Sequence, residues 1–531
     1  MSETEQEPVG ERAATRRTTG EEPVIAGFYP DPTICRVDGD YYLANSSFEY
    51  FPGAPLFHST DLVTWFPVGN ILDRRSQFRT GNLGPSTGIY GGTLRHHDGR
   101  FWFITTNVSD FDSGQVVVWS EDPAGPWSEP LFVPAATGID PDLCWDEEGQ
   151  CYLTWNALSF TGPHRGILQA PLDLTTGRLL APAYPVWQGS GLAAAEGPHL
   201  YRIGEFWYLL LAEGGTERGH CVTAARARTP WGPFEACPWN PVLTHRSTIH
   251  PVQNVGHADL VQAPDGTWAA VYLGARPRGS TPGFHVLGRE TFLAGVDWVD
   301  GWPVFDEDRF DAAPAATWFA DDFSSSTLHP RWVVPGGEPE AVADRLPAGG
   351  LQLRHLPDGT PGLLCARVRD MEWTADATVE RAGRFLLRVD DRHWYALVLQ
   401  DECARVEARI GDLQQDIAEV PVSGETVVLR IECVPPASAP VPLGHAGPDD
   451  VILSVHDGSG FRELARLDGR YLSTEVVSGF TGRMLALAPA QTSGRVLSVE
   501  YAPRPTAVAP IGEAGHIVTT RSNPLSRDRS N

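Results

Sequence analysis

Apolar and polar residues alternate over many short stretches of the chain, a pattern that is typical of β-strands. In the first half of the chain one motif recurs: a short apolar stretch, a turn that contains glycine, and then at once a strand rich in aromatic residues. The turn glycines are Gly39, Gly99, Gly149, Gly204 and Gly266. Strand, glycine turn and strand make a β-hairpin, and five hairpins at a period of roughly 50–60 residues predict a five-bladed β-propeller. Further strands, such as 115–120 and 166–171, are expected to complete the blades; the alternative is an ordinary β-sandwich with coincidental spacing.

The repeat also predicts a site. In a propeller the first strand of every blade runs along the central axis, so equivalent positions at the starts of these strands converge. Counting back eight or nine residues from each turn glycine reaches Asp31, Gly91, Asp140, Glu196 and His257. Each of them alone has an ordinary structural explanation, such as capping of a turn. Three acids at one repeat position indicate function instead, because crowded carboxylates raise one another's pKa at a cost in stability.

Paired carboxylates suit the hydrolysis of a glycosidic bond, which needs a protonated acid on one side and an ionised carboxylate on the other. The two lie roughly 6.5–9.5 Å apart when the second activates water, and about 5–5.5 Å apart when it attacks directly. Opposed blades of a narrow propeller favour the wider gap and therefore inversion. The alternative chemistry is a metal site, since three carboxylates and a histidine can hold Ca²⁺ or another hard cation.

A second domain is expected after a short linker at 312–317. From residue 318 onward alternating strands are predicted at 383–390, 393–400, 404–410, 426–433 and 451–456, which favours an antiparallel β-sandwich. The resulting organisation is all-β: a disordered tail (1–22), a propeller (23–311), the linker, a sandwich (318–503) and a second disordered tail (504–531).

The net charge of the chain limits the classes of binding partner that we expect. The sequence carries 67 acidic and 41 basic residues, for a formal net charge of −26 at pH 7. Such a chain repels phosphate groups, so neither nucleic acid nor an anionic membrane is expected as a partner, whereas neutral sugars are indifferent to the charge. The N-terminal segment, residues 1–22, is polar and lacks the apolar stretch of a signal peptide. We therefore predict a cytoplasmic protein. The eight cysteines show no CxxC pair and are expected to be free thiols.

Several strings resemble glycoside hydrolase family 43, in the branch that contains β-xylosidases and α-L-arabinofuranosidases. They are PVIAGFYPDPTI at 23–34, ANSSFEYFPG at 44–53, EGPHLY at 196–201 and LGRET at 287–291. In the second half, DDF at 321–323 and FTGRM at 480–484 resemble the accessory sandwich of this branch. Such a sandwich packs on the propeller. Whether it lends a residue to the pocket, binds carbohydrate or only braces the fold is left open.

The resemblance implies an inverting enzyme with Asp31 as general base, Glu196 as general acid and Asp140 as the carboxylate that tunes the acid and orients the substrate. It also implies binding residues: Arg289 for sugar hydroxyls, Phe48 at the sugar-binding end, and His257 as an axial contact to an ion or water. No cofactor is required, and a structural Ca²⁺ is left open.

Two positions depart from the family pattern, and they affect the expected choice of sugar more than the expected reaction. Where relatives usually carry Trp-Ala-Pro in the second blade, this chain has Tyr90 followed by Gly91 and Gly92, so Tyr90 is expected to form the aromatic wall of the pocket. Ala195 stands where threonine is common.

The predicted function is the release of terminal β-D-xylose or α-L-arabinofuranose from short (arabino)xylo-oligosaccharides. Two alternatives are a propeller that binds sugar without turnover and a relative that acts on another glycoside, such as arabinan or galactan fragments. An oligosaccharide is the expected partner, and a homo-oligomer is left open.

Overall fold

The computed structural model describes residues 19–312, 315–437, 446–458, 460–490 and 494–504. Strands dominate, and the helices in these ranges are short: η1 (Thr19–Glu21), η2 (Val108–Ser113), α1 (Pro339–Val342), η3 (Gly469–Leu472) and α2 (Thr474–Val477). The protein is therefore all-β, as predicted. Among the described residues, no helix has the length and apolar character needed to cross a membrane.

Most of the two predicted tails, 1–18 and 505–531, lies outside the described residues. The end of the first predicted tail is part of the fold, because η1 is followed by Glu22, whose carboxylate forms an ion pair with Arg276 at 3.0 Å. The eight cysteines all lie within the described ranges, and each is a free thiol.

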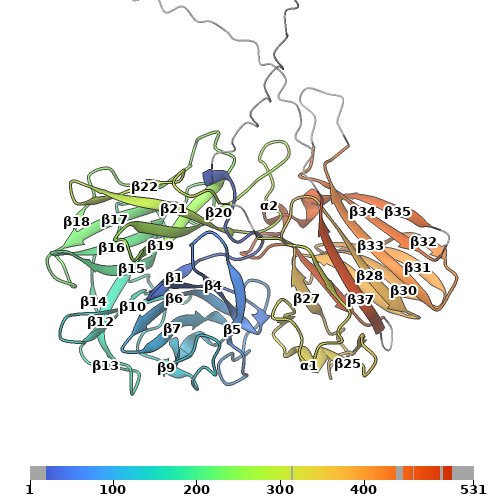
Figure 1. Ribbon diagram of the computed structural model, residues 1–531, viewed down its shortest axis with the longest axis horizontal. Coiled ribbons are helices and arrows are strands. Elements are labelled where there is room, and N and C mark those ends of the chain that lie inside the picture. The colour runs from blue at the N-terminus through green and yellow to red at the C-terminus, as the bar shows by residue number, and fades with distance from the viewer. Residues whose placement is uncertain (1–18, 313–314, 438–445, 459, 491–493, 505–531) are drawn as a thin grey trace, which may run out of the picture.

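The first half of the chain forms five small antiparallel sheets, each built from strands that follow one another in sequence (Figure 1). Their strands are β1 (Thr33–Val37), β2 (Asp40–Ala44), β4 (Gly53–Ser59) and β5 (Phe66–Leu72); β6 (Ile89–His97), β7 (Arg100–Asn107), β8 (Gln115–Ser120) and β9 (Leu131–Val133); β10 (Ile139–Trp145), β11 (Cys151–Asn156), β12 (Ile167–Asp173), β13 (Arg178–Leu179) and β14 (Tyr184–Pro185); β15 (Glu196–Ile203), β16 (Phe206–Glu213), β17 (Cys221–Ala227) and β18 (Glu235–Ala236); and β19 (Gln253–Gln262), β20 (Trp268–Ala275), β21 (Glu290–Val299) and β22 (Trp302–Asp306). Every sheet opens with one of the five predicted hairpins.

The first strands of the five sheets contact one another in a closed ring. Strand β1 contacts β6, β6 contacts β10, β10 contacts β15, β15 contacts β19, and β19 returns to β1. The starts of these strands are thereby brought together, as the repeat requires.

A buried network of charges ties this ring together. Arg95 of β6 donates hydrogen bonds to Asp259 of β19 and to Asp142 of β10, both at 2.8 Å. Thr33 at the start of β1 and Tyr201 of β15 also donate to Asp259, at 2.7 and 2.5 Å. Burial raises the pKa of Asp259, but Arg95, His199 and the Tyr201 hydroxyl outweigh burial and hold the pKa well below its ordinary value. All five first strands therefore contribute to one network.

The second half of the chain forms two larger antiparallel sheets. One contains β23 (Phe319–Asp321), β25 (Ala343–Arg345), β26 (Leu351–Leu353), β28 (Trp373–Glu380), β33 (Thr426–Val434), β34 (Asp450–His456), β35 (Phe461–Asp468) and β37 (Gly494–Pro503); the other contains β27 (Leu364–Arg367), β29 (Gly383–Arg388), β30 (His393–Gln400), β31 (Cys403–Ile410), β32 (Leu413–Pro421) and β36 (Met484–Ala488). Side chains from both sheets, such as Trp373, Leu429, Phe385 and Tyr395, bury one shared core. The five strands predicted in this half correspond to β29, β30, β31, β33 and β34.

The two halves of the chain are joined by strand pairing and by a shared cluster of buried apolar side chains. Strand β3 (Tyr50–Phe51) of the first half pairs with β24 (Val334–Pro335) of the second. Phe28 and Tyr50 share a buried cluster with Trp394 and Met484. An ion pair of 2.9 Å between Arg278 and Glu372 also crosses the junction.

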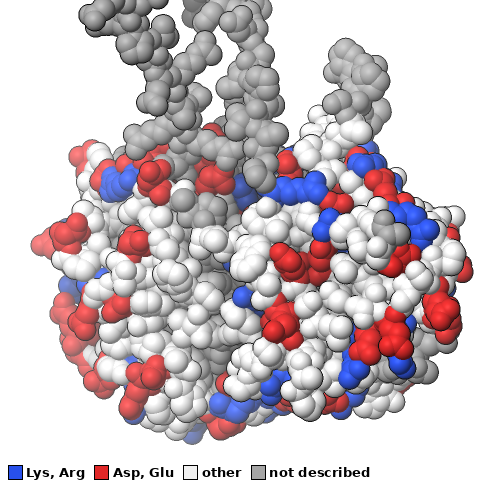
Figure 2. All heavy atoms as spheres, turned by 45° about the vertical axis from the view of Figure 1, so that its right-hand side comes forward, with Lys and Arg blue, Asp and Glu red and all other residues white. Residues whose placement is uncertain are grey.

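The surface reflects the acidic composition. Figure 2 shows acidic side chains in separate groups over the face in view, with basic side chains among them. Repulsion between like charges is thus spread out rather than concentrated in one patch.

The ring network predicts a large stability effect for Arg95→Met. The substitution leaves Asp142 and Asp259 buried without their cation, so we expect a loss of about 3–5 kcal/mol in free energy of unfolding, measured by guanidinium denaturation. Arg228→Met is the matched control, because Arg228 forms an exposed ion pair with Glu205. This substitution is expected to lower the free energy of unfolding by at most about 1 kcal/mol. Equal effects of the two substitutions would contradict the role given to the network.

Candidate active site

A cavity of about 230 Å³ at the starts of the five first strands gathers all seven predicted site residues. It is lined by Asp31, Phe48, Tyr90, Asp140, Glu196, His257 and Arg289, together with Gly91, Ile139, Leu158, Phe160, Thr216, His220 and Phe480. Typical ligand pockets span roughly 300–1,000 Å³, so this cavity has room for a single small ring rather than a chain of them.

Irregular backbone aims the ionisable side chains into the cavity. Asp31, Asp140 and His257 all have left-handed backbone angles, with φ of 50°, 54° and 51°. This conformation costs a non-glycine residue about 1–2 kcal/mol and accumulates where function requires it. The pairing register of β10 shifts around Asp140, and that of β19 shifts around His257. Such a bulge turns a side chain out of the regular alternation along the strand.

Strand β15 also has a left-handed residue at the cavity, but this residue is a glycine and not an ionisable one. Its left-handed residue is Gly197, with φ of 56°, and Glu196 precedes it by one position. Counting from the turn glycines placed Glu196 at the position equivalent to Asp31, so that alignment was wrong by one residue although Glu196 still lines the cavity. In this strand the glycine takes up the left-handed conformation without strain.

The sheet that begins with β6 has Gly91 at the cavity, where there is no space for a side chain. A Cβ atom on Gly91 would lie 2.7 Å from Oδ1 of Asp140 and 2.9 Å from the His257 ring. A side chain at this position would therefore displace one of the two groups.

Asp31 is arranged to stay ionised. It is only 4% exposed, its Oδ1 accepts a hydrogen bond from Arg289 Nη1 at 3.0 Å, and its Oδ2 accepts one from Ser46 Oγ at 2.6 Å. Burial raises the pKa of Asp31, but Arg289, His257 and Ser46 together outweigh burial and leave it below the ordinary value. Burial also lowers the pKa of His257 to about 4, so at neutral pH Arg289 is the cation that faces Asp31.

Glu196 and Asp140 have the opposite tendency. Burial and then the charge of Asp31 raise the pKa of Glu196 to about 7. Burial, followed by Glu196 and Asp31, raises the pKa of Asp140 well above its ordinary value, although Asp140 Oδ2 accepts a hydrogen bond of 3.1 Å from the Gly197 backbone. Because these two carboxyls titrate as a pair, the pair retains a proton at neutral pH while Asp31 is ionised.

An aromatic wall closes one side of the cavity, and part of it comes from the second half of the chain. Phe480, in the loop before β36, stacks on Phe48 with ring centroids 5.6 Å apart. Tyr90, which was predicted to form the wall, packs on both rings, at 5.0 and 5.8 Å. Ser86 holds the loop, because its Oγ accepts the Phe480 backbone N–H at 2.9 Å and its carbonyl accepts the Tyr90 hydroxyl at 2.9 Å.

The polar lining includes two residues that sequence reasoning missed. His220 hydrogen-bonds through Nδ1 to the Asn254 carbonyl at 3.0 Å, and burial lowers its pKa to about 3. A carbonyl can only accept, so Nδ1 carries the proton of the neutral ring and Nε2, which has no partner, is left as an acceptor. Thr216 accepts a hydrogen bond of 2.9 Å from Arg289. Both precede β17 in a loop without periodic pattern.

The surroundings of His257 were considered as a metal site. Its Nδ1 lies 3.6 Å from Asp31 Oδ1, and its ring centroid lies 6.0 Å from that of His199. Within the described ranges, no three His, Cys, Asp or Glu side chains are arranged to hold a metal ion. These side chains do not by themselves provide the roughly six to eight oxygen ligands that Ca²⁺ takes, and the structural Ca²⁺ stays a prediction.

Known families match both halves of the chain. The model of "Glycosyl hydrolases family 43" matches residues 21–303, and that of "Beta xylosidase C-terminal Concanavalin A-like domain" matches residues 320–501. Each match falls on one of the two halves described above.

Curated relatives and solved structures agree with these matches. A xylosidase/arabinosidase of Butyrivibrio fibrisolvens is 46% identical over 294 residues, which is 53% of this chain and 55% of that protein; this match spans about half of each. A non-reducing end α-L-arabinofuranosidase of Bacteroides ovatus is 34% identical over 502 residues, 88% of this chain and 90% of that protein. Among solved structures, Bacteroides ovatus Xyloglucan PUL GH43B has a TM-score of 0.81 at 32% identity, and a xylan β-1,4-xylosidase from Bacillus halodurans has a TM-score of 0.81 at 26% identity; each match covers 91% of this chain and 99% of the other.

Proposed function

The chain belongs to glycoside hydrolase family 43, and we propose that it releases single β-D-xylose or α-L-arabinofuranose units from the non-reducing ends of short (arabino)xylo-oligosaccharides. The observation that carries the proposal is one small cavity in which an ionised Asp31 and a proton-holding Glu196 both line the space for a sugar. The size of the cavity supports exo action, because only one ring fits. The names of the relatives fit either pentose.

We infer a matching architecture. The ring of five small sheets is a five-bladed β-propeller over residues 23–311, and the two larger sheets around one core are a β-sandwich over residues 318–503, with 312–317 as the linker. The closed ring of first strands and the shared core of the second half support this division.

In the proposed reaction, Glu196 donates its proton to the glycosidic oxygen while Asp31 removes a proton from a water molecule on the other face of the sugar. The bond from the water oxygen to the anomeric carbon forms as the bond to the leaving oxygen breaks, through a transition state with oxocarbenium character. Glu196 ends as a carboxylate and Asp31 ends protonated, and exchange with solvent restores both. The configuration at the anomeric carbon is inverted.

The opposite pKa shifts suit these roles. A base must be ionised and an acid protonated at the working pH, and Arg289 and Ser46 favour the ionised form of Asp31 whereas burial and Asp31 favour the protonated form of Glu196. Asp140 lies beside Glu196 and keeps a proton on the pair. The same cavity thus supports acid and base at once.

The remaining lining would hold the sugar. Phe48, Tyr90 and Phe480 present an apolar wall to one face of the ring, while Arg289 and His220 contribute polar groups to the lining. A non-catalytic sugar-binding protein would have no need for a carboxyl held protonated near pH 7. The cytoplasmic location and the lack of a required cofactor stay predictions, and a homo-oligomer stays open.

Loss of either proton-transfer partner is expected to abolish turnover. Asp31→Ala and Glu196→Ala should each lower kcat by about 10²–10⁴-fold or more, measured as nitrophenol release from 4-nitrophenyl β-D-xyloside and α-L-arabinofuranoside. For Glu196→Ala, the loss should be larger still on xylobiose, because its leaving group, unlike nitrophenol, needs protonation to depart. Asp110→Ala, outside the cavity, is the control. Losses below tenfold would contradict the roles, and a folded wild type inactive on both substrates would favour another glycoside or binding alone.

The pH profile is expected to follow Glu196. Activity requires the protonated acid, so kcat/KM should fall as the pH rises through about 7, the pKa of Glu196. Asp140→Asn removes the carboxyl that titrates with Glu196 as a pair, so Glu196 then titrates alone and this basic limb should move. The measurement is kcat/KM against pH for both proteins. A basic limb that stays in place would remove the tuning role from Asp140.

Inversion predicts the first product anomer. Hydrolysis of a β-xyloside should release α-D-xylose first, followed by slow mutarotation, and a ¹H NMR time course distinguishes the two anomers. Initial release of β-D-xylose would instead indicate retention and a covalent intermediate.

A further inference from the structure

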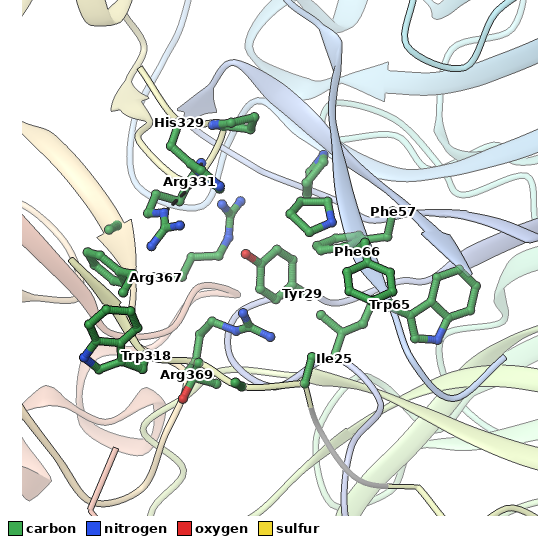
Figure 3. Close-up of a pocket in the computed structure, with 18 of the residues that line it drawn as sticks. Ile25, Tyr29, Phe57, Trp65, Phe66, Trp318, His329, Arg331, Arg367 and Arg369 are labelled. Atoms are coloured by element: carbon green, nitrogen blue, oxygen red, sulfur yellow. Dashed lines mark hydrogen bonds between the residues drawn. The ribbon is translucent and has the colours of Figure 1, made fainter. Parts of the chain in front are cut away.

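A second cavity, of about 350 Å³, lies at the junction of the two halves and shares no lining residue with the active-site cavity. Its walls come from both halves: Tyr29, Phe57, Trp65 and Phe66 from the first, and Trp318, His329, Arg331, Arg367 and Arg369 from the second (Figure 3). Figure 3 shows the arginine side chains gathered around Tyr29, with Phe57, Trp65 and Phe66 on the other side.

Three guanidinium groups line this cavity without a carboxylate partner. Arg331 donates through Nε to His329 Nδ1, Arg367 through Nε to the Phe28 carbonyl, and Arg369 through Nε to the Ala26 carbonyl, at 3.0, 2.8 and 3.2 Å. In the described part of the chain none of the three forms an ion pair. Three cations left unpaired in one place are unexpected in a chain with a formal net charge of −26.

Two acids lie near this group, but neither forms an ion pair with it in the described part of the chain. Asp321 attracts Arg331, but its Oδ2 accepts a hydrogen bond of 2.8 Å from the Trp332 indole. Asp370, next to Arg369, accepts a hydrogen bond of 2.8 Å from Tyr501. The lining of the cavity itself thus holds three arginines and no aspartate or glutamate.

Arg367 gives the clearest evidence for a ligand. It is only 5% exposed and lines the cavity, yet among the residues that the structure describes its Nη2 has no hydrogen-bond partner. A buried cationic donor without an acceptor is costly. The plane of a guanidinium is suited to a carboxylate, which it can bind through two parallel hydrogen bonds. Its position over the Tyr29 ring, 4.7 Å from the centroid, fixes its orientation.

Exposed aromatic rings indicate what would carry the anion. Trp318 is 56% exposed and Phe66 is 60% exposed, and both line the same cavity, one from each half of the chain. Large aromatic side chains exposed beside a cavity are typical of binding sites. Inorganic phosphate would use the arginines alone, whereas a sugar acid would use both the arginines and the rings.

We propose that this junction cavity is a second binding site that takes a sugar carrying a carboxylate, of the hexuronic acid type. Arg331, Arg367 and Arg369 hold the carboxylate, and the ring of the sugar lies against Trp318 and Phe66. The volume is at the lower end of the roughly 300–1,000 Å³ range of ligand pockets, which fits a single sugar acid, either free or at the end of an oligosaccharide.

Calorimetric titration of the full chain with D-glucuronate tests the site, and D-glucose and inorganic phosphate serve as comparison ligands. We expect saturable 1:1 binding of D-glucuronate, none of D-glucose, and weaker binding of phosphate. Arg331→Gln and Trp318→Ala, each at a partly or largely exposed position, should each weaken D-glucuronate binding about tenfold, the effect of losing roughly 1.4 kcal/mol. Thermal unfolding confirms that both variants are folded.

The control is Asp31→Ala, which alters the active site and should leave D-glucuronate binding unchanged. Absence of saturable binding, or binding lost in Asp31→Ala and retained in both cavity variants, would overturn the proposal. Equal binding of phosphate and D-glucuronate, unaffected by Trp318→Ala, would overturn the sugar part of it. Because the readout is binding, failure of the proposed hydrolysis would leave this result unaffected. An oligosaccharide ending in a glucuronate residue distinguishes an attached sugar acid from a free one.

Discussion

The pairing of one buried arginine with two aspartates holds the catalytic half of the molecule together. Arg95 bridges Asp142 and Asp259, which come from different sheets. A buried cation is tolerated only when its counter-ions are held in place, so the network fixes the first strands relative to one another. Two residues before Asp142 and Asp259 stand Asp140 and His257, and two residues before Thr33 stands Asp31. The cavity residues thus stand at the starts of the strands whose next residues form the network, so one set of strands serves both.

The cavity separates acid from base by unequal neighbours rather than by unequal burial. Asp31 faces a guanidinium and a hydroxyl, whereas Glu196 faces the negative charge of Asp31 itself. The charge of Asp31 thereby helps to set the protonation state of Glu196. Arg289 is central to this arrangement, because it also contacts Thr216 and reaches toward the Phe480 carbonyl at 3.4 Å. The charge that keeps Asp31 ionised is thus held partly by the second half of the chain.

Much of this could be predicted from sequence because the information is local. Each hairpin has its own turn glycine and aromatic strand, and the three carboxylates sit eight or nine residues before those turns. His220, Thr216 and Phe480 lie in loops, where no period relates a residue to the axis, and only the folded chain brings them to the cavity. The FTGRM string was noted for its resemblance, but nothing in it indicates that Phe480 stacks on Phe48. Arg331, Arg367 and Arg369 gave no signal at all, since their shared cavity exists only at the junction.

The contribution of Phe480 to the catalytic cavity has an evolutionary consequence. Its loop is encoded nearly two hundred residues downstream of Arg289, beyond the junction between the halves, so the gene specifies the pocket in two separable portions. Recombination that exchanged the downstream portion among homologues could replace one wall of the pocket while leaving both proton-transfer groups intact. Selection on substrate preference can therefore act on a segment whose variation does not endanger the chemistry, provided that the new partner preserves the fit to Ser86.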